Sequence, residues 1–235
     1  ESLKVEAEAG GYDITFINRN VGKKATTYLQ HCQYRGVDGV VIACVDFDDP
    51  QVLELVNSKL PVVTIDHVFN NRAAVVSDNV RGMEELVRYV YAKGHRRIAF
   101  IHGEQTAVTE NRLTGFYRAC DALELEIPDA YIREGVYHDP DRCAELTREL
   151  LRLPEPPTCI LMPDDFSSIG GRNAIHRMDL RLPEDISVAG YDGIQIASVM
   201  SPALTTYRQD TQALGRTAAA KLIELIEKPR TALVD

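Results

Sequence analysis

Short apolar runs that each stop on polar residues recur along the chain, and this pattern sets the expected architecture. The clearest run covers residues 186–191 and ends on Asp192 and Gly193. Other runs follow the same pattern: 62–65 before Asp66, 98–101 before His102, and 159–162 before Pro163-Asp164. Continuous apolar character is typical of strands that a parallel sheet buries on both faces. We therefore predict buried strands with polar carboxyl ends.

Between these runs, apolar residues recur with helical spacing. The best supported stripe consists of Met83, Leu86, Val87 and Val90, and Gly94 supplies a C-terminal stop. Asp49-Pro50 and Asp139-Pro140 predict helix starts, because aspartate is a favoured N-cap and proline a favoured first helical residue. Strands and helices in alternation predict an α/β fold with a largely parallel sheet and right-handed crossovers. In such sheets ligands bind beyond the carboxyl ends of the strands.

The first part of the chain gives further expectations. Residues 1–11 are predicted to form the end of a helix that stops at Gly10-Gly11. Apolar and polar residues alternate over 12–17, which predicts a strand there. A helix is predicted over about 22–35, ahead of a strand over 40–45.

Composition narrows the class of protein. The 235 residues carry 26 Lys and Arg against 35 Asp and Glu, a net charge of −9. This balance argues against the segment gripping nucleic acid by itself, because phosphates require a basic face. No apolar run approaches the roughly 20 residues of a membrane span, and the N-terminus does not resemble a signal peptide. Five cysteines without paired spacing predict reduced thiols in a cytoplasmic protein.

An enzyme is not expected. The sequence has no nucleophile elbow, phosphate loop or metal-ligand spacing. His31, His95, His102 and His138 have no partners at ligand spacing. Residues 190–193 do not form a dinucleotide fingerprint. An acid–base pair from Asp164, Asp165 and Asp192 is the enzymatic alternative, but no catalytic motif accompanies it. We expect neither a cofactor nor a metal.

Local strings resemble the lactose/galactose-repressor (LacI/GalR) family of bacterial transcription regulators. They are GHRRIAFI at 94–101, R-x-x-GF at 112–116, LPEDISVAGYD at 182–192, PALTT at 202–206 and VSDN at 76–79. They occur in the family's order and spacing, so the resemblance covers essentially the whole chain. It implies a periplasmic-binding-protein-like fold of two doubly wound, mainly parallel α/β subdomains joined by three crossovers.

The resemblance also implies a division of the chain. Residues 1–76, completed by 210–228, would form the N-terminal subdomain. Residues 77–209, completed by 229–235, would form the C-terminal subdomain. The family's DNA-binding headpiece, hinge helix and first strand have no counterpart in this sequence, so we expect it to be a fragment of a longer protein.

Five residues are candidates for ligand binding. Arg112 offers five fixed donors beside a helix start, although a structural ion pair is its alternative role. Asp192 can accept two hydroxyl hydrogens at a strand end, with turn capping as its alternative. Asp164 matches an effector contact of the family but could be only the N-cap of a helix over 165–179. Asp66 and Gln209 also match contact positions of the family.

These residues and the resemblance together predict an effector-sensing core. A sugar or sugar derivative would bind between the subdomains of a homodimer and change operator affinity through headpieces outside this chain. An exported sugar-binding protein of the same fold, for transport or chemotaxis, is the alternative. We expect Arg112→Ala to abolish ligand binding and to leave the melting point of the unliganded protein nearly unchanged.

Overall fold

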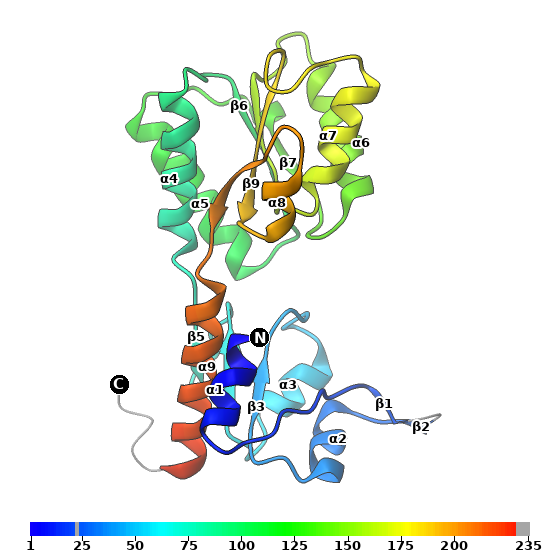
Figure 1. The fold of residues 1–235 in the computed structure, drawn as a ribbon, viewed down its shortest axis with the longest axis vertical. Helices are drawn as coiled ribbons and strands as arrows, with labels where there is room; N and C mark the ends of the chain where they lie inside the picture. Colours follow the sequence, from blue (N-terminus) through cyan, green and yellow to red (C-terminus); the bar gives the residue numbers. More distant parts are fainter. Residues whose placement is uncertain (22–23, 229–235) are drawn as a thin grey trace. The chain divides into compact units, whose positions relative to one another are not determined.

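The computed structural model describes residues 1–21 and 24–228, and within them the chain forms two compact units. Unit 1 combines Glu1–Ser77 with the segment that begins at Asp210, and unit 2 comprises Asp78–Gln209. The chain enters unit 2 after Ser77 and leaves it after Gln209 (Figure 1). The expected completion of the C-terminal subdomain by residues 229–235 lies outside the described residues.

Unit 2 is built around a five-stranded sheet. In chain order its strands are β6 (Ile98–His102), β7 (Ile132–Glu134), β8 (Cys159–Leu161), β9 (Ser187–Asp192) and β10 (Thr205–Arg208). They lie in the order β10-β9-β8-β6-β7, and every neighbouring pair is parallel. The predicted α/β class with a parallel sheet is confirmed.

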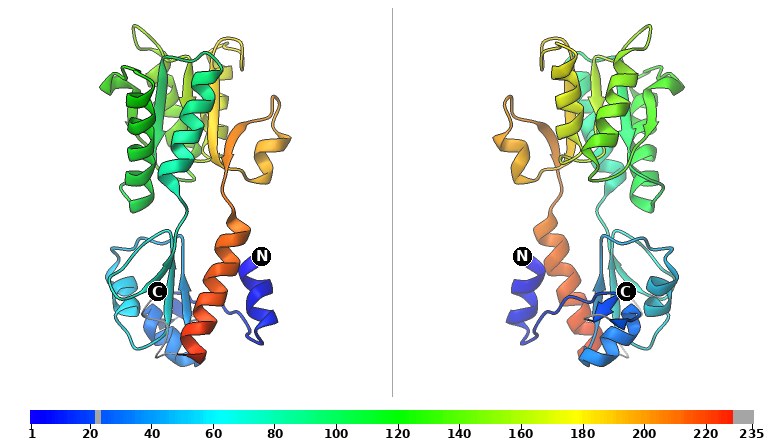
Figure 2. Two further views of the ribbon diagram at one scale, coloured as in Figure 1. Left: turned by 90° about the vertical axis from the view of Figure 1, so that its left-hand side faces the viewer. Right: turned by 90° about the vertical axis from the view of Figure 1, so that its right-hand side faces the viewer.

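Helices cover both faces of this sheet, because its central strands β6 and β8 are apolar on both sides (Figure 2). On one face lie α4 (Asn79–Ala92) and α5 (Ala107–Ala122), and on the other lie α6 (Pro140–Leu151) and α7 (Ser168–Arg177). Successive residues of a strand point to opposite faces of the sheet, so Phe100 packs with the first pair of helices and Ile101 with the second. A 3₁₀ turn, Asp129–Tyr131, and the short helix α8 (Gln195–Val199) complete the unit.

Unit 1 has a smaller sheet of three parallel strands in sequential order, β3 (Val40–Ile42), β4 (Val62–Ile65) and β5 (Ala73–Val75). Its helices are α1 (Ser2–Ala9), α2 (Tyr28–Arg35), α3 (Pro50–Val56) and α9 (Thr211–Glu227). Helix α9 packs against both α1 and the sheet, so the C-terminal helix completes this unit (Figures 1 and 2). Two short strands, β1 (Asn20–Val21) and β2 (Lys24–Ala25), pair antiparallel.

Side-chain caps fix where the helices begin. Asp49 accepts a hydrogen bond from Gln51 N at 2.8 Å, and Asp139 accepts one from Arg142 N at 2.9 Å. Both predicted Asp-Pro helix starts are thus confirmed. The predicted helix over 22–35 instead begins at Tyr28, because Thr27 and Gln30 form a capping box there.

The predicted strand over residues 12–17 is wrong. The segment has no regular secondary structure, and Phe16 is 86% exposed. Alternation supplies an apolar face, but a strand also needs a neighbour to satisfy its backbone groups. Among the described residues no strand pairs with this segment.

Candidate functional site

Four of the five candidate residues lie at the carboxyl ends of the strands of unit 2. Asp192 is the last residue of β9, Asp164 follows β8, and Gln209 follows β10. Arg112 reaches the same edge from α5. Because the strands are parallel, their polar ends converge on one side of the sheet, as expected for a ligand site.

Arg112 is held from several sides. Its side chain is buried, Nε donates to Asn79 Oδ1 at 2.9 Å, and Nη1 donates to the Pro163 carbonyl at 2.8 Å. Nη2 lies 3.5 Å from Asp192 Oδ1. The guanidinium carbon lies 3.7 Å from the centroid of the Tyr191 ring. These contacts fix the plane of the guanidinium, which is the geometry that recognises a ligand oxygen directionally.

Asp192 has a restrained backbone and a carboxylate that is partly accessible to solvent. Its backbone has φ 109°, a region that side-chain-bearing residues rarely adopt. Oδ1 accepts from Gln209 Nε2 at 2.6 Å, whereas Oδ2 has no partner among the described residues. Burial raises the pKa of Asp192, although Arg112 and Gln209 oppose that shift. The carboxylate can therefore accept from a hydroxyl that displaces water.

Sequence reasoning missed Tyr137, which borders the same arginine. Its ring centroid lies 5.5 Å from the Arg112 guanidinium carbon, and its hydroxyl lies 2.9 Å from Thr109 Oγ1. Burial raises the pKa of Tyr137. The available signal was its place between the end of a strand and the Asp139-Pro140 helix start. An aromatic ring beside a guanidinium gives the site an apolar surface as well as polar donors.

Asp164 occupies a more enclosed position. It is 1% exposed, and Oδ1 accepts from Ser167 N at 2.7 Å. Oδ2 accepts from Ser167 Oγ at 2.7 Å and from His138 N at 2.9 Å. Both carboxylate oxygens are used within the protein, in the turn that precedes α7. The N-cap of that helix is Ser167, so Asp164 is not the N-cap that the sequence offered as its alternative role. The neighbouring Asp165 accepts from Ile194 N at 2.8 Å, and burial raises its pKa.

Asp66 belongs to unit 1, where it follows β4. It has φ 61°, and Oδ1 accepts from Ser77 N at 3.0 Å. The next residue, His67, stacks on Phe47 with ring centroids 4.4 Å apart and contacts Phe69 at the same distance. The carboxyl end of the unit 1 sheet therefore also joins a carboxylate to an aromatic surface.

In residues 1–21 and 24–228, no three His, Cys, Asp or Glu residues gather as a metal ion would require. Over the same ranges, none of the helices has both the length and the apolar character of a membrane-spanning segment.

Polar side chains at the carboxyl ends of parallel strands, in each of two α/β units, define a periplasmic-binding-protein-like domain. A family model described as a periplasmic binding protein-like domain matches residues 87–234. The chain is also 30% identical over 236 residues to the HTH-type transcriptional repressor PurR of Escherichia coli O139:H28 (strain E24377A / ETEC), covering 98% of this chain and 69% of the repressor. This chain therefore belongs to the LacI family of transcriptional regulators, and the resemblance seen in the sequence is confirmed.

Solved structures agree with that assignment. A LacI family transcriptional regulator from Mycobacterium smegmatis has a TM-score of 0.85 and 26% identity, over 97% of this chain and 84% of that one. The complex of the transcriptional regulator CelR with cellobiose has a TM-score of 0.81 and 26% identity, over 98% of this chain and 72% of that one. These relatives favour a regulator over an exported binding protein.

Proposed function

We propose that this chain is an effector-sensing core that binds a sugar or sugar derivative. The observation that carries the proposal is the oriented pair of Arg112 and Asp192. One offers donors and the other an acceptor, as vicinal hydroxyl groups require. Tyr137 adds a ring surface suited to the apolar face of a sugar. The relative CelR in complex with cellobiose supports the same ligand class.

The site is suited to binding rather than catalysis. Arg112 is engaged by Asn79 and by the Pro163 carbonyl, so its guanidinium is held in place as a hydrogen-bond donor. The sequence contains no motif that would supply a nucleophile or a general base beside Asp192. We therefore propose that the bound molecule leaves chemically unchanged.

An effector acts as a signal only if it prefers one conformational state of the protein. A ligand with contacts to unit 2 alone would not distinguish arrangements of the two units, so a second set of contacts is needed. Asp66 in unit 1 is the proposed source. Following the family, we propose that the chain works as a homodimer in the cytoplasm and reaches operator DNA through headpieces outside this segment.

Isothermal calorimetry and thermal unfolding test the ligand class directly. We would screen cellobiose, ribose and other sugars, with a purine base as the contrasting class. A sugar at 100 times its Kd is expected to add about 2.7 kcal/mol to the free energy of unfolding. A purine that binds when no sugar does would contradict the proposed class.

A conservative variant tests the site itself. Arg112→Lys keeps the positive charge but loses the planar set of donors, so the sugar is expected to bind at least about tenfold more weakly. Arg118→Lys is the matched control, because Arg118 is exposed on the same helix. Equal affinity of the two variants would place the sugar elsewhere.

A further inference from the structure

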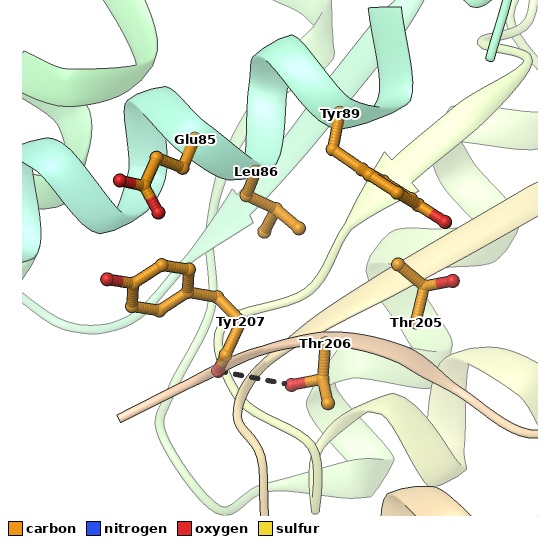
Figure 3. Close-up of a pocket in the computed structure, with 6 residues that line it drawn as sticks. All are labelled: Glu85, Leu86, Tyr89, Thr205, Thr206 and Tyr207. Carbon is orange, nitrogen blue, oxygen red and sulfur yellow. Dashed lines mark hydrogen bonds between the residues drawn. The ribbon is translucent and has the colours of Figure 1, made fainter. Parts of the chain in front are cut away.

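A groove in unit 2 lies between α4 and β10, the strand at the end of the sheet. It encloses about 430 Å³. Its lining residues are Glu85, Leu86, Tyr89, Thr205, Thr206 and Tyr207 (Figure 3). None of the five ligand-binding candidates lines it. The volume falls in the range of small-molecule pockets.

Two aromatic rings and a leucine are among the residues that line this groove. Figure 3 shows Tyr207 below Glu85 on one side of the groove, Tyr89 on the other side, and Leu86 between them. Leu86 is buried, and Tyr89 is 48% exposed. The faces of tyrosine rings carry the negative part of the aromatic quadrupole, so they attract cations. Lys93 Nζ already lies 5.3 Å from the centroid of the Tyr89 ring.

Glu85 gives the groove a negative charge and a carboxylate oxygen that can accept a further hydrogen bond. Its Oε1 accepts from Arg81 Nε at 2.8 Å, in a pair whose side chains are 73% and 48% exposed. Exposed pairs of this kind are weak, because water screens the two charges. Oε2 has no partner within the described part of the chain. A carboxylate oxygen is therefore free to accept from a ligand.

We propose that this groove binds a small organic cation, with a guanidinium or alkylammonium group against Glu85 and an alkyl stem over Leu86. An anion would be repelled by the carboxylate. A purely apolar molecule would cover Glu85 without compensating for its lost hydration. A cation with a short stem satisfies the carboxylate, the ring faces and the leucine together.

Calorimetric titration with n-butylguanidinium tests the proposal, and n-butylurea is the neutral isostere of almost the same shape. The wild-type chain is expected to bind the guanidinium saturably and at least about tenfold more tightly than the urea, because only the guanidinium carries the charge. Equal binding of the two compounds, or no binding of either, would overturn the proposal.

Matched variants locate the binding. Glu85→Gln is expected to weaken butylguanidinium binding about tenfold, whereas Glu84→Gln, outside the groove on the same helix, removes the same charge and should leave binding within about twofold. Tyr89→Leu is expected to weaken it about fivefold. Its control is Tyr117→Leu, since Tyr117 is 49% exposed on α5. Loss of binding in the control variants, or none in the groove variants, contradicts the site.

A variant of Arg81 is expected to bind butylguanidinium more tightly, in contrast to the groove variants. Arg81→Ala removes the cation that competes for Glu85, so the affinity for butylguanidinium is expected to rise roughly twofold. Weaker binding would show that Arg81, rather than the groove, orients the ligand and would overturn the assignment. Neither result depends on the identity of the sugar effector.

Discussion

The guanidinium of Arg112 lies over the Tyr191 ring, 3.7 Å from its centroid, deep in unit 2. Tyr191 is the residue before Asp192 in β9, so one strand provides both the ring beneath the arginine and the carboxylate beside it. Removal of Arg112 therefore affects more than a ligand contact.

Arg112→Ala is expected to destabilise the unliganded protein by about 3–5 kcal/mol, because it removes the cation that compensates for the part-buried charge of Asp192 and deletes the hydrogen bond to the Pro163 carbonyl. The sequence alone predicted a nearly unchanged melting point for this variant. Because Arg112 is buried, we now expect the melting point to fall. Urea unfolding measures the effect. An unchanged free energy of unfolding would mean that water compensates fully for the lost contacts.

The strained backbone of Asp192 provides a second test. Positive φ in a residue with a side chain costs roughly 1–3 kcal/mol, and glycine avoids most of that cost. Asp192→Gly is therefore expected to be about 1 kcal/mol more stable than Asp192→Ala, although both lack the carboxylate and should lose effector binding. Chemical denaturation of the two variants compares them directly. Equal stabilities would show that no strain is stored at this position.

Much of the architecture was predictable, because the central strands β6 and β8 of unit 2 are buried on both faces and are unbroken apolar runs in the sequence. The failure at residues 12–17 has a clear cause: alternation shows which residues share a face but not whether a partner strand exists. The site shows a similar limit. The positions of Arg112 and Asp192 were predictable, but the saturation of Asp164 depends on a hydrogen bond from His138, which is distant in sequence.

Asp164 is expected to act mainly on stability. Asp164→Ala would leave the backbone N–H of Ser167 and that of His138 without their acceptor, at a cost of about 2–4 kcal/mol. Effector affinity, measured calorimetrically on the folded fraction, is expected to change by less than about threefold. A large loss of affinity with little loss of stability would instead make Asp164 a ligand contact.

The half-buried carboxyl group of Asp192 predicts a particular pH dependence. Burial raises the pKa of Asp192 above the ordinary 3.8. At pH values between 3.8 and the raised pKa, the carboxyl group therefore holds its proton in the folded state more often than in the unfolded chain. This group's contribution to stability therefore falls as pH rises from about 4 through the raised pKa. Asp192→Asn has no carboxyl group to ionise, so it does not lose stability in this way as pH rises. Its free energy of unfolding, relative to wild type, is expected to increase between pH 4 and pH 7.

Asp185 is the control of opposite sign. A hydrogen bond from Arg181 lowers the pKa of Asp185 to about 2, so its contribution is present above pH 3.8 and is lost as pH falls toward 2. Relative to wild type, Asp185→Asn should therefore lose stability as pH rises from about 2 to 4. Urea titrations at fixed pH values measure both slopes. Slopes of the same sign in the two variants would contradict the assignment.

The cysteines predict how the folded chain reacts with thiol reagents. Burial raises the pKa of Cys120, Cys143 and Cys159 to about 12, whereas Cys44 is exposed. Because the thiolate is the reactive form, the buried thiols should be nearly inert toward Ellman's reagent at pH 8. We expect one fast equivalent per folded chain, and the remaining equivalents only after unfolding in urea. Cys44→Ser should remove the fast phase, and a fast phase that persists in this variant would show that a buried cysteine is opened by local unfolding.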